Sequence, residues 1–449
     1  MRVAVRPGRS FTQRVRLLLW CVTLGYSAPS QALGLVEAWR QALSHDPVFQ
    51  AAIHARNAEA EEKNIGRAAL LPKINYDYSH SHNDSTVTSG ELRSDRNYNS
   101  HASTLSFQQP LLDYEAWSRY QQGGASAQMG NEQLRDAVQQ LLVRLFQAYS
   151  NVLFSQEEIA LVQAQRRAYR EQYRLNQRLF EQGEGTRTDI LETEARLNLA
   201  DAQLIEAQDN LNLSEQELAK LLGAPIAAAQ LAPLDARFAP RPLQPANFGH
   251  WQNLALHHNA QLLALSQSLA VSRYEIERSR AGHMPRVTLV ANARKSSSDS
   301  ESSYNQKYDT RSIGVQISVP LFAGGGVSAA TRQAGERYQQ AAKEKDEQIL
   351  TVQLELRRQF NLVTSSQAKI KAYQLAERAA QALVLATRKS VSGGERVNLD
   401  VLNAEQQLYS TRRDLAEARY AWLSAWLQLR YYAGTLDEQT LRQLAAYFG

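Results

Sequence analysis

The feature that most constrains this chain is a ladder of large apolar residues that occurs twice with the same seven-residue spacing. The rungs are Ile190, Leu197, Leu204, Leu211 and Leu218 in the first ladder and Val401, Leu408, Leu415, Trp422 and Leu429 in the second. The two ladders lie 211 positions apart, rung for rung, and small residues such as Ala200, Ala207 and Ala418 stand between the rungs. This spacing predicts long helices that pack lengthwise on other helices, and the small residues let the backbones approach closely.

The repetition extends to most of the chain. The matched residues outside the ladders are Pro72 with Pro285, Pro110 with Pro320, and Gly223 with Gly434. Their offsets are 213, 210 and 211 positions, so only a few residues were gained or lost between the copies. We therefore predict two structural repeats, at 33–223 and 248–434, with a proline-rich linker at 224–247 and a C-terminal tail at 435–449.

Each repeat is predicted to begin with one helix and to continue with a β-hairpin. The helical patterns cover 36–70 and 250–282, and each ends before a proline, where helices commonly stop. The hairpins are predicted at 73–109 and 286–319, because the apolar residues there change to a period of two.

The last of the four strands has the clearest alternation. Its apolar residues are Ile313, Val315, Ile317 and Val319, separated by small or polar residues. Such a strand has one apolar and one polar face. Ser, Asn and Asp are frequent at 84–98 and 296–308, which we interpret as the hairpin loops. Each strand is then expected to have about ten residues.

The longest helical patterns follow the hairpins, at 114–180 and 326–391. If the first of them is continuous, its 67 residues reach roughly 100 Å. Gly123 and Gly124 weaken its first turns by about 1 kcal/mol each relative to alanine, so continuity is not required there. Tight turns at Gln182–Arg187 and Ser392–Arg396 lead into the ladder helices, predicted at 188–222 and 397–434.

Residues 1–32 resemble a secretory signal peptide. They contain five arginines and no acidic residue, an apolar run from Leu17 to Tyr26, and a small-residue cleavage pattern at Ser30–Ala32. An uncleaved anchor is the alternative, but the apolar run is about half of the roughly 20 residues that a membrane span needs. We therefore expect export from the cytoplasm.

The same segment explains the charge and the cysteine content of the chain. The formal net charge of +5 equals the contribution of its five arginines, so the remainder is close to neutral. A neutral remainder argues against nucleic acid as a partner. The single cysteine, Cys21, also lies there, so no thiol chemistry is expected in the mature chain.

The alternating strands then limit the architecture. A strand with one apolar face lies in lipid only within a closed barrel, which pairs every backbone group, and known barrels have at least about eight strands. Four strands per chain fall short, so we expect self-association, and three copies would supply twelve. A soluble helical bundle with decorative hairpins is the alternative, but it leaves the apolar strand faces unexplained.

The order of helix, hairpin, long helix, tight turn and helix, given twice, resembles the TolC family of outer-membrane exit ducts. The segment Gly183–Ala195 is most similar to the family members that serve type I secretion of proteases and lipases. The resemblance implies a mixed, mostly α fold and a homotrimer. Its twelve-stranded β-barrel would lie in outer-membrane lipid and continue as a twelve-helix α-barrel in the periplasm.

The resemblance also implies partners and a set of functional residues. The partners are an inner-membrane ABC transporter, a periplasmic adaptor protein and a secreted protein in transit, while the duct itself is passive. Thr188, Asp189 and Arg396 correspond to the periplasmic gate of the family, where a carboxylate and a guanidinium pair. A solvated acid at a helix start is the alternative for Asp189. The family's gate tyrosine is replaced by Val391, so one link of the gate is missing.

Two further groups of residues follow from the resemblance. Asp400 corresponds to the first of two entrance aspartates, and Asn403 replaces the second, so an entrance ring should attract cations less strongly. An ordinary exposed carboxylate is the alternative for Asp400. Gly183, Gly185 and Gly394 correspond to the tips that meet the adaptor, although any tight connection between helices also favours glycine.

The remaining motifs give no enzyme. The imidazoles of His80, His82 and His101 could suggest metal, but we interpret them as polar side chains at a barrel rim. Gly324–Gly326 lacks the Lys-Ser/Thr of a phosphate loop and is assigned to a bend between strand and helix. There is no HExxH, no GxSxG and no paired carboxylates in a plausible cleft, so we expect no catalysis, no metal and no cofactor.

Three functions therefore compete. The first is a type I secretion duct, which the Gly183–Ala195 segment favours. The second is the outer-membrane duct of a multidrug efflux pump. The third is a periplasmic coiled-coil scaffold or adhesin, which would not require detergent for solubility.

Overall fold

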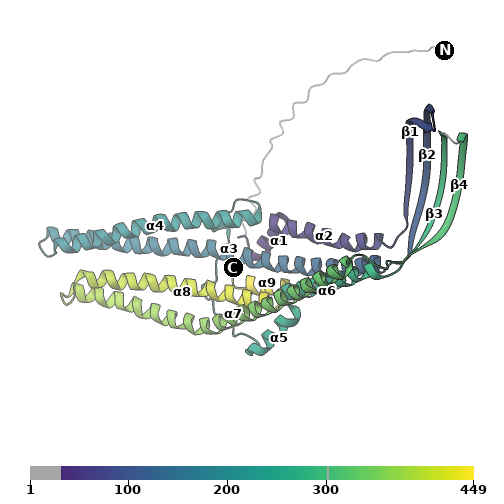
Figure 1. Ribbon diagram of the computed structural model, residues 1–449. Coiled ribbons are helices and arrows are strands. Elements are labelled where there is room, and N and C mark those ends of the chain that lie inside the picture. The colour runs from purple at the N-terminus through teal and green to yellow at the C-terminus, as the bar shows by residue number, and fades with distance from the viewer. Residues whose placement is uncertain (1–31, 301–302) are drawn as a thin grey trace, which may run out of the picture.

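Two very long helices form the spine of the molecule (Figure 1). The computed structural model describes residues 32–300 and 303–449, so the predicted signal peptide lies outside the described residues except for Ala32. Helix α3 spans Tyr114–Glu181 with 68 residues, and helix α7 spans Gly326–Ser392 with 67 residues. Both are continuous, including the first turns of α3 at Gly123 and Gly124, where the sequence pattern left continuity open.

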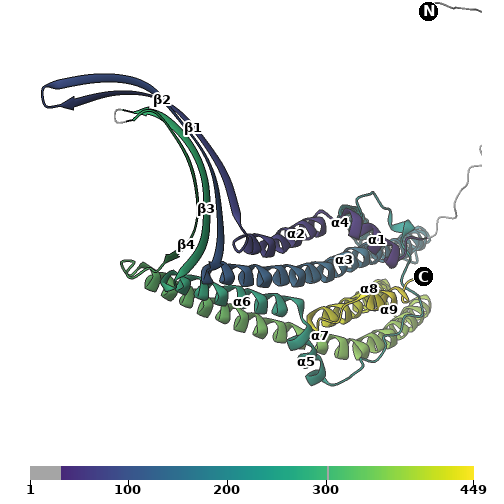
Figure 2. The same cartoon turned by 90° about the vertical axis from the view of Figure 1, so that its right-hand side faces the viewer.

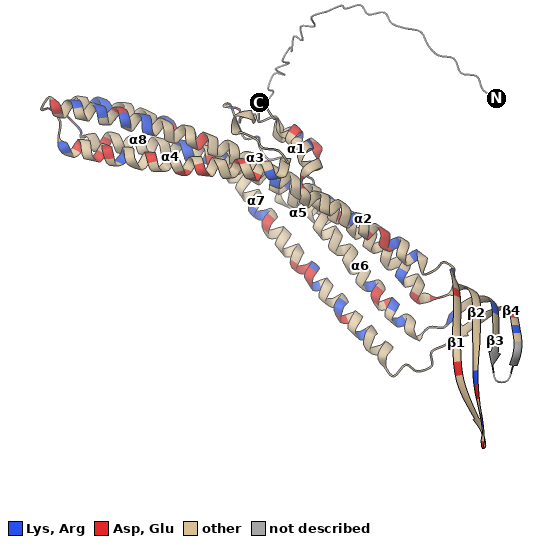
Figure 3. Cartoon of the chain, turned by 90° about the horizontal axis from the view of Figure 1, so that it is seen from above, with Lys and Arg blue, Asp and Glu red and all other residues tan. Residues whose placement is uncertain are grey.

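The ladder helices pack back against this spine. Helix α4 (Arg187–Leu222) lies along α3, and helix α8 (Asn398–Tyr432) lies along α7. We call α3 with α4 the first helix pair and α7 with α8 the second helix pair. Lys, Arg, Asp and Glu are interspersed along these helices (Figure 3). None of the described helices is both long and apolar enough to cross a membrane.

The helices that were predicted as single elements at 36–70 and 250–282 are each broken in two, which corrects that expectation. The first becomes α1 (Leu35–His45) and α2 (Pro47–Ala68), and the second becomes α5 (Phe248–His258) and α6 (Ala260–Arg280). A short 3-10 turn, Ala281–His283, follows α6.

A side chain at each break explains why the helix restarts. The buried Asp46 carboxylate accepts a hydrogen bond from the Phe49 N–H at 3.0 Å and pairs with Arg144 of α3 at 2.7 Å. Pro47 disfavours helical backbone in the residue before it, so the break falls at Asp46. At the second break, the buried Asn259 side chain accepts from the Leu262 N–H at 3.1 Å.

The strands form one antiparallel sheet in the order β1-β2-β3-β4. Their bounds are Lys73–Ser89 for β1, Leu92–Leu112 for β2, Arg286–Ser300 for β3 and Ser303–Ser318 for β4. Figure 2 shows that the sheet curves strongly away from the helices. Within the described chain, β1 and β4 each have one neighbouring strand, so the outer edge of each is unpaired.

The strands are longer than predicted, with 17, 21, 15 and 16 residues. The expected polar loops at 84–98 and 296–308 are wrong, because their described residues mostly belong to the strands. Backbone pairing does not require apolar side chains, so the ladder continues through Ser, Asn and Asp. Ser89 pairs directly with Leu92, and Gly90, with φ of +63°, supplies the left-handed conformation for this two-residue turn.

One face of the sheet is apolar and uncovered. Ile313, Val315 and Ile317 of β4 are 77%, 58% and 66% exposed. In the pairing register, Ile313 lies opposite Ala291 of β3, and Ile317 lies opposite Val287. The predicted alternation of the last strand is therefore confirmed, and its apolar face is available to an apolar surrounding.

The main hydrophobic core lies where the two helix pairs pack against the linker and the C-terminal tail. Trp422 and Tyr149 are fully buried there, and the linker and tail contribute to the same cluster through Phe238 and helix α9 (Glu438–Ala445). The Tyr149 hydroxyl lies 3.0 Å from the carbonyl oxygens of both Leu33 and Ala232 and donates to one at a time. The linker, which includes the 3-10 turn Ala228–Gln230, is thus part of the folded core.

Glycines set the close contact between α2 and α3. A Cβ at Gly66 would lie 2.7 Å from the Arg119 carbonyl oxygen, and a Cβ at Gly123 would overlap the Glu62 carbonyl. Gly124, which follows directly, has nothing within 4 Å of the same position. Gly123 therefore permits close backbone approach and does not interrupt α3.

We expect opposite effects from alanine at these two neighbouring glycines. Gly123→Ala should lower the free energy of unfolding by about 1–3 kcal/mol, because the added methyl group forces α2 away from α3. Gly124→Ala, the matched control, should be neutral or stabilise by up to about 1 kcal/mol through helix propensity. Thermal unfolding of the detergent-solubilised protein measures both, and equal melting temperatures would contradict this packing.

Candidate gate at the tips of the helix pairs

The turns that close the two helix pairs lie at the same end of the molecule, far from the sheet (Figure 1). Gly183 and Gly394 have φ of +79° and +77°, in the left-handed region that favours glycine. The Gly183 N–H donates to Phe180 O at 3.0 Å, and the Gly394 N–H donates to Val391 O at 3.1 Å. A Cβ at Gly185 would lie 2.9 Å from the Phe180 nitrogen. The turns themselves require these glycines, and their contact with an adaptor stays a prediction.

Asp189 caps its own helix. Its carboxylate accepts from the Thr186 hydroxyl at 2.6 Å, and the Asp189 N–H donates to Thr186 Oγ1 at 3.1 Å. The carboxylate also accepts from the Thr186 backbone N–H at 3.3 Å, and this bond together with the one from the Asp189 N–H forms a capping box at the start of α4. Thr188, which directly precedes Asp189, is exposed.

The expected pairing of Asp189 with Arg396 is not made within the chain. Arg396 is exposed in the turn before α8, and among the described residues it forms no ion pair with Asp189. The carboxylate is instead engaged by the N-terminus of α4. The gate role of Thr188, Asp189 and Arg396 stays a prediction, and within one chain Asp189 makes the contacts of a capping residue.

The two predicted entrance residues occupy different surroundings. Asp400 lies half-buried in the first turn of α8. Asn403 is exposed, and its Oδ1 accepts from Arg196 Nη2 of α4 at 3.1 Å. Arg196 also donates to Gln406 of α8. Asn403 therefore links the second helix pair to the first.

A buried network of polar side chains also joins the helix pairs. We call it the inter-pair network; its members are Gln172 and Asn176 of α3, Thr193 of α4 and Asn398 of α8. The Asn176 and Asn398 amides donate to Thr193 Oγ1 at 2.8 and 3.2 Å. Gln172 donates to the amide oxygens of Asn176 and Asn398 at 3.1 and 2.8 Å.

The inter-pair network has the properties of a specific link. Asn176, Thr193 and Asn398 are 4%, 0% and 6% exposed, so water does not readily replace lost partners. The Thr193 hydroxyl donates to Asp189 O at 2.8 Å while accepting the two amides. An unsatisfied buried polar group costs about 1–3 kcal/mol, so the network favours one alignment of α8 on the first pair.

The sequence reading missed this network. Thr193 lies seven positions before Ala200, among the small residues between the apolar rungs, so the spacing alone gives it no polar role. The available signal was the presence of Asn176 and Asn398 beside the tip turns, where a helix seam usually has apolar residues. That signal does not identify which side chains meet, because the two amides are 222 positions apart.

An apolar layer follows the network toward the middle of the helices. Tyr169 of α3, Ala200 of α4 and Leu402 of α8 form a buried cluster. Burial raises the pKa of the Tyr169 hydroxyl. Nearby, burial also raises the pKa of Glu405, and its ion pair with Arg388 only partly opposes that rise.

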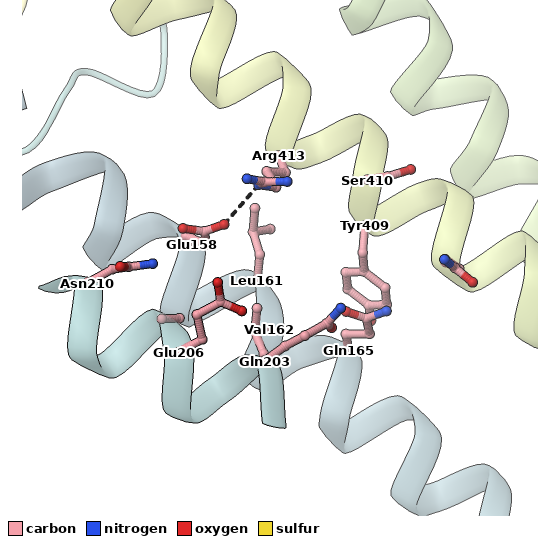
Figure 4. A pocket seen from close by; sticks show the side chains of 12 residues that line it. Glu158, Leu161, Val162, Gln165, Gln203, Glu206, Asn210, Tyr409, Ser410 and Arg413 are labelled. Atoms are coloured by element: carbon pink, nitrogen blue, oxygen red, sulfur yellow. Dashed lines mark ion pairs between the residues drawn. The ribbon is translucent and has the colours of Figure 1, made fainter. Parts of the chain in front are cut away.

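Beyond this layer the helix pairs separate around a polar cavity of about 410 Å³ (Figure 4). Helices α3, α4 and α8 line it, and Glu158 and Arg413 pair across it at 2.8 Å. Among residues 32–300 and 303–449, no group of three or more His, Cys, Asp or Glu side chains could hold a metal ion. The chemistry of this end is non-covalent contact between two helix pairs.

A curved sheet with an uncovered apolar face, continued by long helix pairs that meet at polar contacts, defines the fold of outer-membrane channels. Solved structures share it. The MtrE channel of Neisseria gonorrhoeae aligns with a TM-score of 0.76 over 90% of both chains at 19% identity. VceC of Vibrio cholerae aligns with a TM-score of 0.75 over 89% of this chain and 96% of that one, at 20% identity. At such identities the similarity shows the fold alone.

The chain belongs to the outer membrane efflux protein family, whose model matches residues 38–224 and 251–435. It is 49% identical to the alkaline protease secretion protein AprF of Pseudomonas aeruginosa, over 93% of this chain and 88% of that protein. It is 48% identical to the proteases secretion protein PrtF of Dickeya chrysanthemi, over 97% and 96%. Identity to the outer membrane protein TolC of Escherichia coli is 28%, over 94% and 86%. The predicted TolC-like fold and outer-membrane location are confirmed.

Thr193→Val tests whether the inter-pair network holds the helix pairs together. The change keeps the shape of the side chain but removes the acceptor of two buried amides, at about 1–3 kcal/mol. Because 1.4 kcal/mol corresponds to tenfold, the open fraction of the channel should rise about tenfold in planar bilayers.

Thr411→Val is the matched control. Thr411 is also buried, but its hydroxyl bonds only within α8 among the described residues. Its single-channel record should match that of the wild type. A similar change in both variants would contradict a specific role for Thr193.

Proposed function

We propose that this protein is the outer-membrane duct of a type I secretion system and that it conducts an unfolded protein, of the protease or lipase type, out of the cell. The identity of nearly half to two protease secretion proteins, over almost the whole chain, is the observation that carries the proposal. The chain shares 28% identity with TolC of Escherichia coli, well below that level. The duct would receive its substrate from an ABC transporter and a periplasmic adaptor.

The open sheet edges support a homotrimer. A transmembrane sheet must pair every backbone group, and the outer edges of β1 and β4 have no partner within the described chain. Three copies would pair these edges and close a barrel of twelve strands, an even number as in bacterial barrels. The helices also expose apolar side chains that neighbouring copies could cover, among them Ile205 of α4 and Leu375 of α7, which are 62% and 57% exposed.

The gate would work through the contacts at the tips. Opening requires the helix pairs to untwist, which breaks the inter-pair network and releases Arg196 from Asn403. Since Asp189 and Arg396 do not pair within one chain, their gate role requires contact between neighbouring protomers. Three Asp400 carboxylates around the axis would form the entrance ring. An adaptor that meets the turns at Gly183, Gly185 and Gly394 would lie close enough to shift these contacts.

Efflux is the second candidate, because the family model describes efflux proteins and the chain is 22% identical to the cation efflux system protein CusC of Escherichia coli. A wide passive tube need not recognise what passes through it. The partner proteins, rather than the duct, would then decide between secretion and efflux.

Complementation separates these functions. In a Pseudomonas aeruginosa strain that lacks AprF, expression of this chain should restore alkaline protease in the medium, because the partners would recognise a duct 49% identical to their own. TolC of Escherichia coli, at 28% identity to this chain, serves as the matched control and should restore less. Protein that reaches the outer membrane and restores resistance to toxic compounds, but not protease release, would contradict the secretion role.

The gate residues can be tested separately from the helix cap. Arg396→Ala and Asp189→Ala should each raise the open fraction of the channel in planar bilayers. If the two side chains pair between protomers, the open fraction of the double variant should be close to that of either single variant. Thr186→Ala is the control, because it removes the cap while leaving the carboxylate in place. An equal rise with Thr186→Ala would show that loss of the cap, rather than loss of a gate contact, opens the channel.

A further inference from the structure

The register of the sheet places a group of basic side chains on the same face as the apolar residues. Residues opposite one another across all four strands form rows. One such row is Tyr76, Leu105, Ala293 and Arg311; the next on this face is Tyr78, Ser103, Lys295 and Asp309; the next is His80, His101, Ser297 and Lys307. Because side chains two positions apart share a face, His82 belongs to this face as well. The residues between them along each strand belong to the opposite, polar face.

We call His80, His82, His101, Lys295, Lys307 and Arg311 the basic belt. The belt borders the apolar band on the side toward the hairpin turns. These turns lie at the end of the sheet away from the helices (Figure 2). On β1 the apolar residues Ile74, Tyr76 and Tyr78 lead directly to His80, and each of the three is more than 60% exposed. On β4, Ile313 is followed on the same face by Arg311.

The belt is level with respect to a membrane plane. Strands in transmembrane barrels tilt by about 35–45° and lie about 4.8 Å apart. Residues at the same height in the membrane are therefore shifted by roughly one position along the strand at each step to the next strand. Across the three steps from β1 to β4 this amounts to about four residues. The belt is shifted by the same four positions. On β1 it lies in the row of His80, and on β4 it reaches the row of Arg311, which contains Tyr76 of β1.

Its distance from the helical side also fits a membrane boundary. From the exposed Leu71, just before β1, to His80 is nine positions, and from Arg311 to the exposed Leu321, just after β4, is ten. A tilted strand needs about 9–11 residues to cross the hydrocarbon core. The belt therefore lies at the level of the lipid headgroups on the side of the hairpin turns.

The charge of the belt is positive and accessible. Asp309 is the acidic residue within these rows, and it lies 3.6 Å from Lys295 and 3.8 Å from Arg311. Lys295, Lys307 and Arg311 together outweigh it by two charges, and the three imidazoles add further donors. The Lys295 and Arg311 side chains are 73% and 79% exposed. Although both lie near Asp309, these exposed side chains can also reach an anion above the apolar band.

We propose that the basic belt binds the phosphate groups of lipid headgroups in the outer leaflet. The inference rests on the proposed placement of the sheet in the outer membrane. Basic side chains beside an apolar surface are the chemistry that recognises anionic lipid, since the acyl chains cover the apolar band while the phosphates meet the cations. Bound lipid would fix the height of each protomer in the membrane.

The test compares lipid retention by charge variants. The purified trimer is mixed in detergent with bisphosphorylated lipid A or with phosphatidylcholine, and native mass spectrometry counts the lipid that stays bound. The wild type should retain lipid A preferentially. The triple variant Lys295→Gln, Lys307→Gln, Arg311→Gln should bind it at least about tenfold more weakly.

Arg294→Gln is the matched control. Arg294 precedes Lys295 but lies on the opposite, polar face, in the row of Asp77, Thr104 and Thr310. It removes the same type of charge and should leave lipid A binding unchanged. Equal loss in both variants, or no preference of the wild type over phosphatidylcholine, would overturn the proposal.

Conductance of the same preparations separates this inference from the proposed function. Variants that conduct normally but show no change in lipid retention would overturn the belt and leave the duct intact. Wild-type protein that inserts into no bilayer would overturn both. If the triple variant does not assemble, Lys295→Gln and Arg311→Gln alone test the same contact, with a smaller expected loss for each.

Discussion

Unpaired backbone groups at two sheet edges are the constraint on which the rest of this structure depends. A four-stranded sheet with an uncovered apolar face is stable neither in water, where the face is exposed, nor in lipid, where the edges cost several kcal/mol for each lost hydrogen bond. Sharing the edges among copies removes both costs at once. The helices then follow, because each strand pair joins a helix at both of its ends and a closed sheet arranges those helices side by side.

The helical part combines rigid and releasable contacts. Near the sheet, α2 and α3 touch through glycine, and in the middle an aromatic core buries Trp422 and Tyr149. Toward the tips the contacts between the helix pairs become polar. They are the inter-pair network around Thr193, the hydrogen bond from Arg196 to Asn403, and the ion pair of Arg413 with Glu158 across the cavity. Apolar packing resists separation in proportion to the area exposed, whereas a satisfied polar network can exchange its partners for water. The contacts at the tips can therefore be released while the packing near the sheet stays in place.

The sequence predicted those parts of the fold that depend on local pattern. The seven-residue ladders predicted helices α4 and α8, and the glycines predicted the turns at Gly183 and Gly394. The alternation of apolar and polar residues predicted the strand that ends at Ser318. The prediction missed the separation of α1 and α2 at Asp46, although Asp46 and Pro47 are local signals of a helix start. What the sequence does not show is that Arg144, 98 positions away, pairs with the Asp46 carboxylate. Nor did it predict strands through the polar stretches, since backbone pairing leaves no apolar signal. The sequence also did not predict the inter-pair network, because the partner of a buried amide is known only once the helices are placed in space.

The two hairpins differ in height, and this asymmetry has a consequence for the outside of the cell. Strands β1 and β2 have 17 and 21 residues, while β3 and β4 have 15 and 16, and the first hairpin continues for nine positions beyond His80 to Ser89. In a threefold assembly the mouth of the duct would be a crown of three tall points alternating with three low ones. Any large particle that lands on the mouth would touch the Gly90 turns before it touches anything else.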